Sequence, residues 1–104
     1  MSIKINLRPA EVTMYTCKDI HAGYGLPFSC ANDKLAIQAF KAYCLTDSEG
    51  IANCNNIELY KCGKFNRDTG EYRNTKMILL ERGKKYGVQN RVQRKSTNSS
   101  ASRQ

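Results

Sequence analysis

The sequence predicts an α+β domain, in which one helix packs on one face of a small antiparallel sheet of about four strands, followed by a disordered basic C-terminal tail. Three observations lead to this prediction. Runs of β-prone residues occur before and after a single segment with helical periodicity. A turn-forming segment joins the last two runs. Near residue 84, apolar residues give way to basic and small polar ones.

The first strands are predicted from alternating and β-branched residues. Apolar and polar residues alternate over residues 3–7, which is the period of a β-strand. A second run, 12–17, is rich in valine, threonine and tyrosine, which favour strands. The next segment, 18–28, has two glycines and a proline among aromatic residues. It predicts an ordered loop that presents Tyr24 and Phe28.

A helix is predicted to begin after Asn32 or Asp33 and to end near Leu45. Either polar side chain can accept a hydrogen bond from the free amide groups of the first turn. Residues 46–50 predict a turn, and residues 51–56 predict a loop. The apolar residues at helical spacing are Ala36, Ile37, Phe40 and Cys44.

A β-hairpin is predicted to follow the helix. Residues 57–65 read as a strand, and residues 71–80 as the return strand. The connection, 66–70, is rich in turn-forming residues, and Gly70 can adopt a positive φ there. In the first strand of this hairpin, alternation predicts one face with Ile57, Leu59 and Phe65, and an opposite face with Tyr60 and Cys62.

The charge of the chain is concentrated at its C-terminal end. Residues 81–104 carry seven basic side chains and one acidic one, whereas residues 1–80 carry ten basic and eight acidic ones. The net charge is +8. We therefore divide the chain into a domain, 1–83, and a disordered basic tail, 84–104, because the tail has too few apolar residues to order itself.

A nearly neutral domain with a basic tail predicts a polyanionic partner, and nucleic acid above all. Mobile cations neutralise phosphates, and tyrosines beside cations on the domain can stack on unpaired bases, which favours single-stranded over double-stranded DNA. No membrane partner is predicted. The predicted contacts are Arg82, Lys84, Lys85, Arg91, Arg94 and Lys95 towards the tail, and Lys61, Lys64, Arg73, Tyr60 and Tyr72 on the domain.

Nothing in the sequence predicts catalysis. The triplet 68–70 matches that of aspartic proteases, but it lies in a polar turn rather than after a buried strand. We predict no catalytic residues, no metal site and no cofactor. The five cysteines are spaced unlike zinc ligands, so buried thiols are favoured over a metal or redox module, which remains an alternative.

Two further expectations follow from composition. The sequence has no long apolar run and no secretory signal, so we expect the protein to act inside the cell that makes it. A domain of about 80 residues has a small core, and a homodimer is one way to enlarge it.

An ordered series of motifs resembles one protein family. Its members are the small nonstructural DNA-binding proteins of chlamydiaphage-type microviruses (gokushoviruses), which are phages with circular single-stranded DNA. The family has a strand ending in Tyr-Asp, a Pro-Phe loop, an Ala-x-Arg-x-Phe helix and a Leu-x-x-x-Gly-x-Phe-Asp-x-x-x-Gly hairpin. The matching segments here are 14–19, 24–28, 32–40 and 57–70, with Gln38 at the arginine position and Asn66 at the aspartate position.

The resemblance covers about residues 12–83 and leaves out the basic tail. It implies a nonstructural protein of infection, compared to the microviral C protein, which helps to switch replication towards single-strand production and packaging. The resulting hypothesis is a nonenzymatic DNA-binding accessory protein in the host cell cytoplasm, docked on a viral replication complex or procapsid. The alternative is a protein-interaction module that modulates viral or host proteins with only weak DNA contact.

Overall fold

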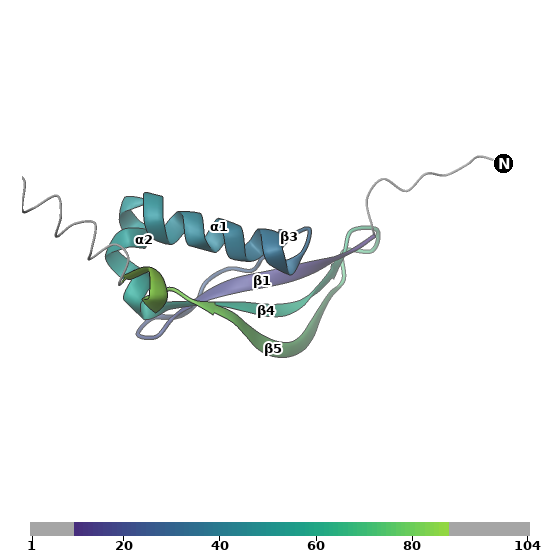
Figure 1. The fold of residues 1–104 in the computed structure, drawn as a ribbon. Coiled ribbons are helices and arrows are strands. Elements are labelled where there is room, and N and C mark those ends of the chain that lie inside the picture. Colours follow the sequence, from purple (N-terminus) through teal and green to yellow (C-terminus); the bar gives the residue numbers. More distant parts are fainter. Residues whose placement is uncertain (1–9, 88–104) are drawn as a thin grey trace, which may run out of the picture.

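Figure 1 shows the fold in a computed structural model, which describes residues 10–87. Both helices lie on the same side of an antiparallel sheet, so the predicted α+β class is confirmed. Within the described part, no helix has the length and apolar character needed to cross a membrane. In chain order the elements are β1 (Glu11–Asp19), β2 (Gly23–Tyr24), β3 (Phe28–Cys30), α1 (Asp33–Thr46), α2 (Ser48–Asn53), the 3₁₀ turn η1 (Cys54–Asn56), β4 (Ile57–Asn66) and β5 (Tyr72–Arg82).

The sheet has the strand order β2-β1-β4-β5, and every one of these pairs is antiparallel. The short strand β3 also pairs with β1, on the side where β2 lies. The path has the predicted number of strands, although β2 lies in a segment that was predicted as a loop, and β3 adds a fifth strand. The strand predicted over residues 3–7 lies outside the described residues.

The segment predicted as an ordered loop contains two of these strands. Asp19 begins the turn between β1 and β2, since its side chain accepts hydrogen bonds from the backbone amides of His21 and Ala22 at 2.8 and 3.1 Å. Gly23 then adopts a φ of +99°, which is accessible to glycine without strain. The turn returns the chain alongside β1, where Tyr24 pairs with Lys18.

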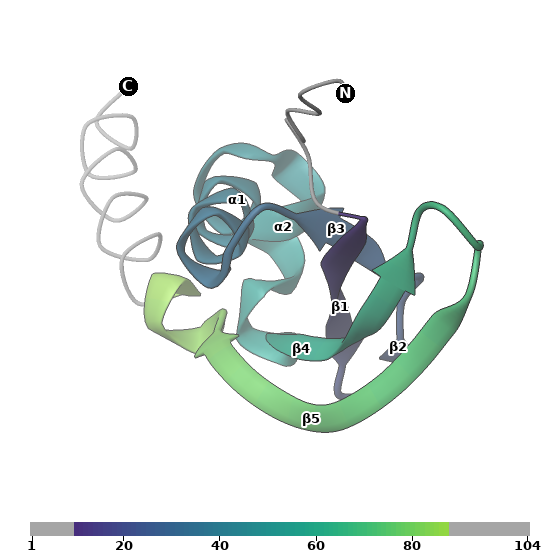
Figure 2. The ribbon, with the colours of Figure 1, turned by 90° about the vertical axis from the view of Figure 1, so that its right-hand side faces the viewer.

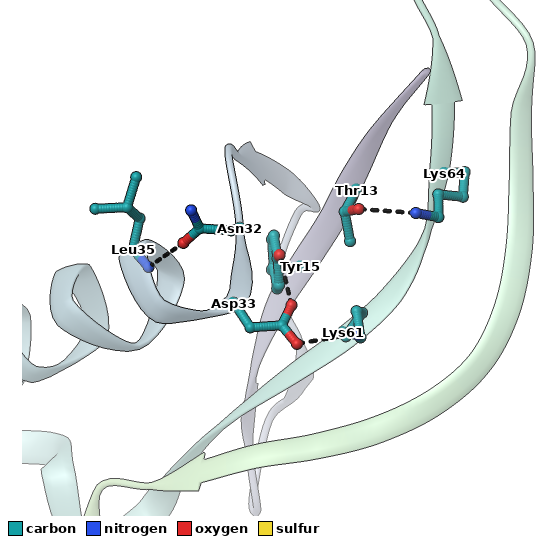
Figure 3. A network of polar contacts seen from close by, with 7 residues as sticks. All are labelled: Thr13, Tyr15, Asn32, Asp33, Leu35, Lys61 and Lys64. Atoms are coloured by element: carbon teal, nitrogen blue, oxygen red, sulfur yellow. Dashed lines mark hydrogen bonds and ion pairs between the residues drawn. The ribbon is translucent and has the colours of Figure 1, made fainter. Parts of the chain in front are cut away.

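Helix α1 begins where the sequence predicts it. The Asn32 side chain accepts a hydrogen bond from the amide of Leu35 at 2.8 Å, which makes Asn32 the N-cap (Figure 3). The buried side chains Ala36, Phe40 and Cys44 are four residues apart and face the sheet as one stripe.

The turn and loop predicted over residues 46–56 are wrong for most of their length. Residues 48–53 form α2, and η1 follows it directly. Asp47 caps α2, because its carboxylate accepts hydrogen bonds from the amides of Glu49 and Gly50 at 2.9 and 3.4 Å. Gly50 fits closely against Tyr43 of α1, where a Cβ atom would clash with the backbone. The segment is too short to show helical periodicity, so its cap was the one available signal.

The predicted hairpin between β4 and β5 is confirmed. The Asn66 side chain accepts hydrogen bonds from the amides of Asp68 and Thr69 at 2.8 and 3.0 Å. Gly70 has a φ of +80° and donates its amide hydrogen to the Asn66 carbonyl at 2.7 Å. These contacts are local in sequence, which explains why the turn was predictable.

A β-bulge interrupts β4 at Cys62. Tyr15 of β1 pairs with Lys61, but the next residue of β1 in the ladder, Met14, pairs with Gly63, so Cys62 has no partner there. The pairing between β4 and β5 is irregular at the same place, and β5 curves strongly around the sheet (Figure 2). Bulges bend and twist a strand in this way.

The bulge changes which side chains share a face beyond it. The prediction that Phe65 lies on the face of Ile57 and Leu59 is wrong. Phe65 pairs with Val12 and lines a hollow with Val12 and Met14, whereas Ile57 and Leu59 belong to the core. Simple alternation gave the wrong face because it does not include an inserted residue.

The core lies between the helices and the sheet and extends past the predicted end of the domain. Residues 84–87 form a helical turn, in which the amides of Tyr86 and Gly87 donate to the Gly83 carbonyl at 2.8 and 3.1 Å. Tyr86 is only 4% exposed and its ring contacts Phe40 edge-on, at 6.4 Å between centroids. The folded body therefore continues through residue 87 instead of ending at 83. The rest of the predicted disordered tail, 88–104, lies outside the described residues.

Candidate nucleic-acid interface

Asp33, the first residue of α1, connects the helix to two strands (Figure 3). One carboxylate oxygen accepts a hydrogen bond from the Tyr15 hydroxyl at 2.8 Å, and the other lies 2.9 Å from the Lys61 ammonium. These two hydrogen bonds, chiefly that from Lys61, lower the pKa of Asp33. Burial, followed by the bond to Asp33, raises the pKa of Tyr15. Lys61, predicted to bind DNA, is therefore engaged within the fold.

Lys64 lies on the same side of the sheet as Lys61. In a regular strand these two residues, three positions apart, would face opposite sides, and the bulge at Cys62 brings them together. The Lys64 ammonium donates a hydrogen bond to the Thr13 hydroxyl at 2.9 Å (Figure 3). Its positive charge also helps to lower the pKa of Asp33.

Three other predicted basic residues of the folded body have acidic partners. Their side chains are 58–61% exposed, so the pairs are solvated and weak, and a phosphate can compete for the cations. The three pairs are Arg73 with Glu11 at 3.1 Å, Arg82 with Glu58 at 3.8 Å and Lys85 with Glu81 at 3.3 Å. The remaining predicted cation of the body, Lys84, is exposed and has no ion pair within residues 10–87.

The structure distinguishes tyrosines of the core from tyrosines of the surface. Tyr15 is fully buried in the core. Tyr60 is half-buried, and its hydroxyl donates to the Glu58 carboxylate at 2.9 Å. Tyr72 is exposed, with its hydroxyl 3.3 Å from the Cys62 sulfur, and this contact and partial burial raise the pKa of Tyr72 to about 12.

A row of side chains crosses the sheet on the face opposite the helices. Tyr24 of β2 pairs with Lys18 of β1, Lys18 pairs with Glu58 of β4, and Glu58 pairs with Arg82 of β5. Directly paired residues share a face, and the residue after Glu58, Leu59, lies in the core on the helix side. We call Tyr24, Lys18, Glu58 and Arg82 the open-face row.

Contacts hold the open-face row together. The Lys18 ammonium lies over the Tyr24 ring, 5.3 Å from its centroid. The ring of Tyr60 meets that of Tyr24 edge-on, with 5.8 Å between centroids and 70° between planes. Since Glu58 also accepts from the Tyr60 hydroxyl and pairs with Arg82, its negative charge is shared between two partners.

Sequence reasoning missed Lys18 and Tyr24 as site residues. The tyrosine nearest to Lys18 in the sequence is Tyr15, but Tyr15 points to the helix side of the sheet. The tyrosine that lies beside Lys18 is Tyr24, from the neighbouring strand β2. The available signal was the pair of glycines around Tyr24, which bring the chain back beside β1.

An apolar hollow of about 410 Å³ lies between α1 and the β2–β3 segment. Leu26 stands at its edge and is 90% exposed. Leu26 thereby extends the apolar lining of the hollow to the surface of the protein. The lining residues are Cys17, Gly25, Leu26, Phe28, Ala39, Phe40 and Tyr43.

The five cysteines all lie within the described part of the chain, and none forms a disulfide there. Burial raises the pKa of the Cys17, Cys30 and Cys44 thiols, and that of Cys44 reaches about 12. Between residues 10 and 87, no group of three histidine, cysteine, aspartate or glutamate side chains is placed to hold a metal ion.

The remaining predicted contacts, Arg91, Arg94 and Lys95, lie outside the described residues. Comparison with known proteins found no match among curated proteins and none among solved structures. One family model, described as Phage ORF5 protein, matches residues 12–86, which span the elements from β1 to β5 except the first residue of β1, Glu11. The match also ends at Tyr86, close to the end of the folded body. The chain belongs to the Phage ORF5 protein family.

Proposed function

We propose that this phage protein is a nonenzymatic DNA-binding accessory protein of a single-stranded DNA phage of the chlamydiaphage type. It acts in the host cytoplasm, in the replication switch or in DNA packaging, in a role comparable to that of the microviral C protein. The replication complex or procapsid is its protein partner. Membership of the phage family and the ordered motifs at 14–19, 24–28, 32–40 and 57–70 support this proposal.

The distribution of charge is the observation that carries the proposal. All nine acidic residues lie within residues 11–81, and four of them pair with basic side chains. Residues 10–87 have only two more basic than acidic side chains. Residues 1–9 and 88–104 contain no acidic residue, and they hold the six other basic residues: Lys4, Arg8, Arg91, Arg94, Lys95 and Arg103. Basic segments that contain no acidic residue, joined to a nearly neutral body, are suited to phosphate contacts.

The test uses the full chain, because a cut after residue 83 would also remove the buried Tyr86. One variant replaces Arg91, Arg94 and Lys95 with glutamine. The matched control, which has the same net charge, replaces Lys34, Lys41 and Lys76, three exposed lysines with no ion pair in the described residues. Binding to a single-stranded oligonucleotide is measured across a range of salt concentrations.

The first variant should bind more weakly and show a salt slope smaller by as much as about 2, since each lost single-strand phosphate contact removes roughly 0.7. The control should keep most of the wild-type slope. Equal losses in the two variants would contradict the placement of the phosphate contacts. A wild-type protein that binds neither single-stranded nor double-stranded DNA would overturn the proposed function itself.

A second candidate is a protein-interaction module, and the apolar hollow beside Leu26 favours it. A protein partner would cover this side chain. The test is recovery of viral or host proteins by the tagged protein from infected cells after nuclease treatment. Under this candidate, Leu26→Asp should abolish the recovery while the affinity for DNA stays weak in both proteins.

A further inference from the structure

We propose that Tyr24 is a stacking site for one base of single-stranded DNA, with Lys18 and Arg82 of the open-face row contacting the neighbouring phosphates. This inference rests on the proposed DNA-binding function and names the part of the folded body that takes part in it. Stacking has to come from the body, because all the aromatic residues of the chain lie within residues 10–87.

The Tyr24 ring is the most exposed aromatic side chain of the described part, at 53%. The orientation of the ring is also fixed by its neighbours. Tyr60 meets it edge-on, and the hydroxyl of Tyr60 is fixed by its hydrogen bond to Glu58. A stacking platform needs an accessible ring with a defined orientation, and these contacts provide both.

The backbone around Tyr24 is ordered on both sides. Before it, the Asp19 side chain closes the turn that leads through Gly23. After it, the amide of Gly25 donates a hydrogen bond to the Cys17 carbonyl at 2.8 Å. A ring held in this way loses little conformational freedom when a base stacks on it.

Lys18 can change partner when a base arrives. Its ammonium now lies over the Tyr24 ring, and an exposed contact of this kind is weaker than the stacking of a base on an aromatic ring. A base that takes the place of the ammonium brings its own phosphate close to Lys18. Arg82, 61% exposed and only loosely paired with Glu58, gives a second cation at the other end of the row.

The geometry favours single-stranded over double-stranded DNA. The row crosses four strands, a span of roughly 14 Å at the usual strand spacing. In a duplex, the bases are paired and stacked on one another, so a ring standing on a sheet cannot reach their faces. The basic segments outside the body can contact the phosphates of either form.

The experiment compares two tyrosines in the full chain, with an unpaired oligothymidine and a hairpin duplex of equal phosphate number as probes. Tyr24→Leu removes the ring and keeps an apolar side chain, while Tyr24→Phe keeps the ring. Tyr72→Leu is the comparison variant. The sequence predicts Tyr72 as a DNA contact too, but it lies outside the row, and we assign the stacking to Tyr24 and withdraw it from Tyr72. Thermal unfolding shows whether each variant is folded. Photocrosslinking of wild type to iodouracil-containing DNA locates the stacked residue independently.

Tyr24→Leu should weaken oligothymidine binding by about 5- to 100-fold, as expected for one lost stacking contact. Tyr24→Phe, Tyr72→Leu and all duplex affinities should stay within about threefold of wild type, and the crosslink should map to Tyr24. If wild type binds oligothymidine and Tyr24→Leu binds equally well, or if the crosslink maps elsewhere, the stacking site is wrong while DNA binding stands. If wild type binds neither probe, the proposed function fails.

Discussion

The ammonium of Lys61 lies 2.9 Å from the carboxylate of Asp33, which also accepts the hydroxyl hydrogen of the buried Tyr15. One carboxylate at the start of α1 thereby joins the helix to β4 and β1. Two consequences follow. The contact contributes to the stability of the fold, and it occupies a lysine that sequence alone predicts as a DNA contact.

Removing Asp33 should lower the free energy of unfolding more than removing Lys61 does. Asp33→Ala leaves the hydroxyl of the fully buried Tyr15 without its acceptor and should lower the free energy of unfolding by about 1–3 kcal/mol. Lys61→Met removes only a partly exposed ion pair and should lower it by about 0.2–1 kcal/mol. Urea unfolding measures both. Lys34→Met, on the exposed side of the same helix, is the control for removing a lysine.

The same Lys61→Met variant tests the role of this lysine. Because Lys61 is engaged with Asp33, its loss should change the affinity for single-stranded DNA by less than about twofold, after correction for net charge with Lys34→Met. A much larger loss would mean that Lys61 leaves Asp33 to contact a phosphate.

The stability of the protein should fall in acid partly through Asp33. Its pKa in the folded state lies below the ordinary value of about 3.9, because Lys61 and Tyr15 hydrogen-bond to the ionised carboxylate. The stabilisation is therefore fully present well above pH 3.9, and it is lost as the pH falls through 3.9 towards the folded-state pKa. The difference in unfolding free energy between wild type and Asp33→Asn should shrink between pH 6 and pH 3.

Other carboxylates with lowered pKa values, Asp19 and Glu81, are present in both proteins and cancel in this comparison. For Glu81, burial alone would raise the pKa, but hydrogen bonds from Tyr86 and Lys85 outweigh it. A constant difference across this pH range would contradict the assignment of the effect to Asp33.

Gly63, beside the bulge, should not tolerate a side chain. A Cβ atom there would lie 2.7 Å from the Arg73 carbonyl oxygen and 2.6 Å from the Tyr72 hydroxyl. The tyrosine can move, but the backbone carbonyl is held by the ladder, so Gly63→Ala should destabilise the protein by about 1–3 kcal/mol. Gly25→Ala is the control, because its Cβ atom would make an ordinary contact of 3.5 Å. Equal unfolding midpoints for the two variants would contradict this account of the bulge.

The parts of the fold that the sequence predicts correctly depend on local contacts. The start of α1 follows from the Asn32 cap, and the hairpin turn follows from Asn66 and Gly70, each within a few residues of its partners. The bulge at Cys62 depends on how β4 pairs with β1, some 45 residues earlier in the chain, and alternation along one strand does not reveal it.

The same limit applies to the candidate site. Basic residues and tyrosines could be selected by type, but their partners could not. Lys18 contacts the tyrosine opposite it on β2 rather than the one nearest to it in sequence, because strand register brings Tyr24 there. Asp33 accepts from Lys61, 28 residues away, through packing of the helix on the sheet. Tertiary pairing therefore decides which cations remain available for phosphate.

The folded body should depend on residues that composition assigns to the tail. Tyr86 packs its ring against Phe40 and donates its hydroxyl hydrogen to Glu81 at 2.7 Å. Tyr86→Ala should lower the free energy of unfolding by about 3–5 kcal/mol, as for other large aromatic residues in cores. Tyr86→Phe keeps the packing and should lose about 0.5–3 kcal/mol, because the hydrogen bond to a charged group is lost.

A chain cut after Gly83 should be as unstable as Tyr86→Ala, whereas a chain cut after Gly87 keeps the helical turn and its contact with Phe40. Thermal unfolding followed by circular dichroism compares the two. If both truncated chains unfold at the wild-type temperature, Tyr86 is not part of the core. If only the shorter chain is destabilised, any loss of DNA binding in it reflects unfolding as well as lost charge, and the longer chain is the one to use for measuring the tail.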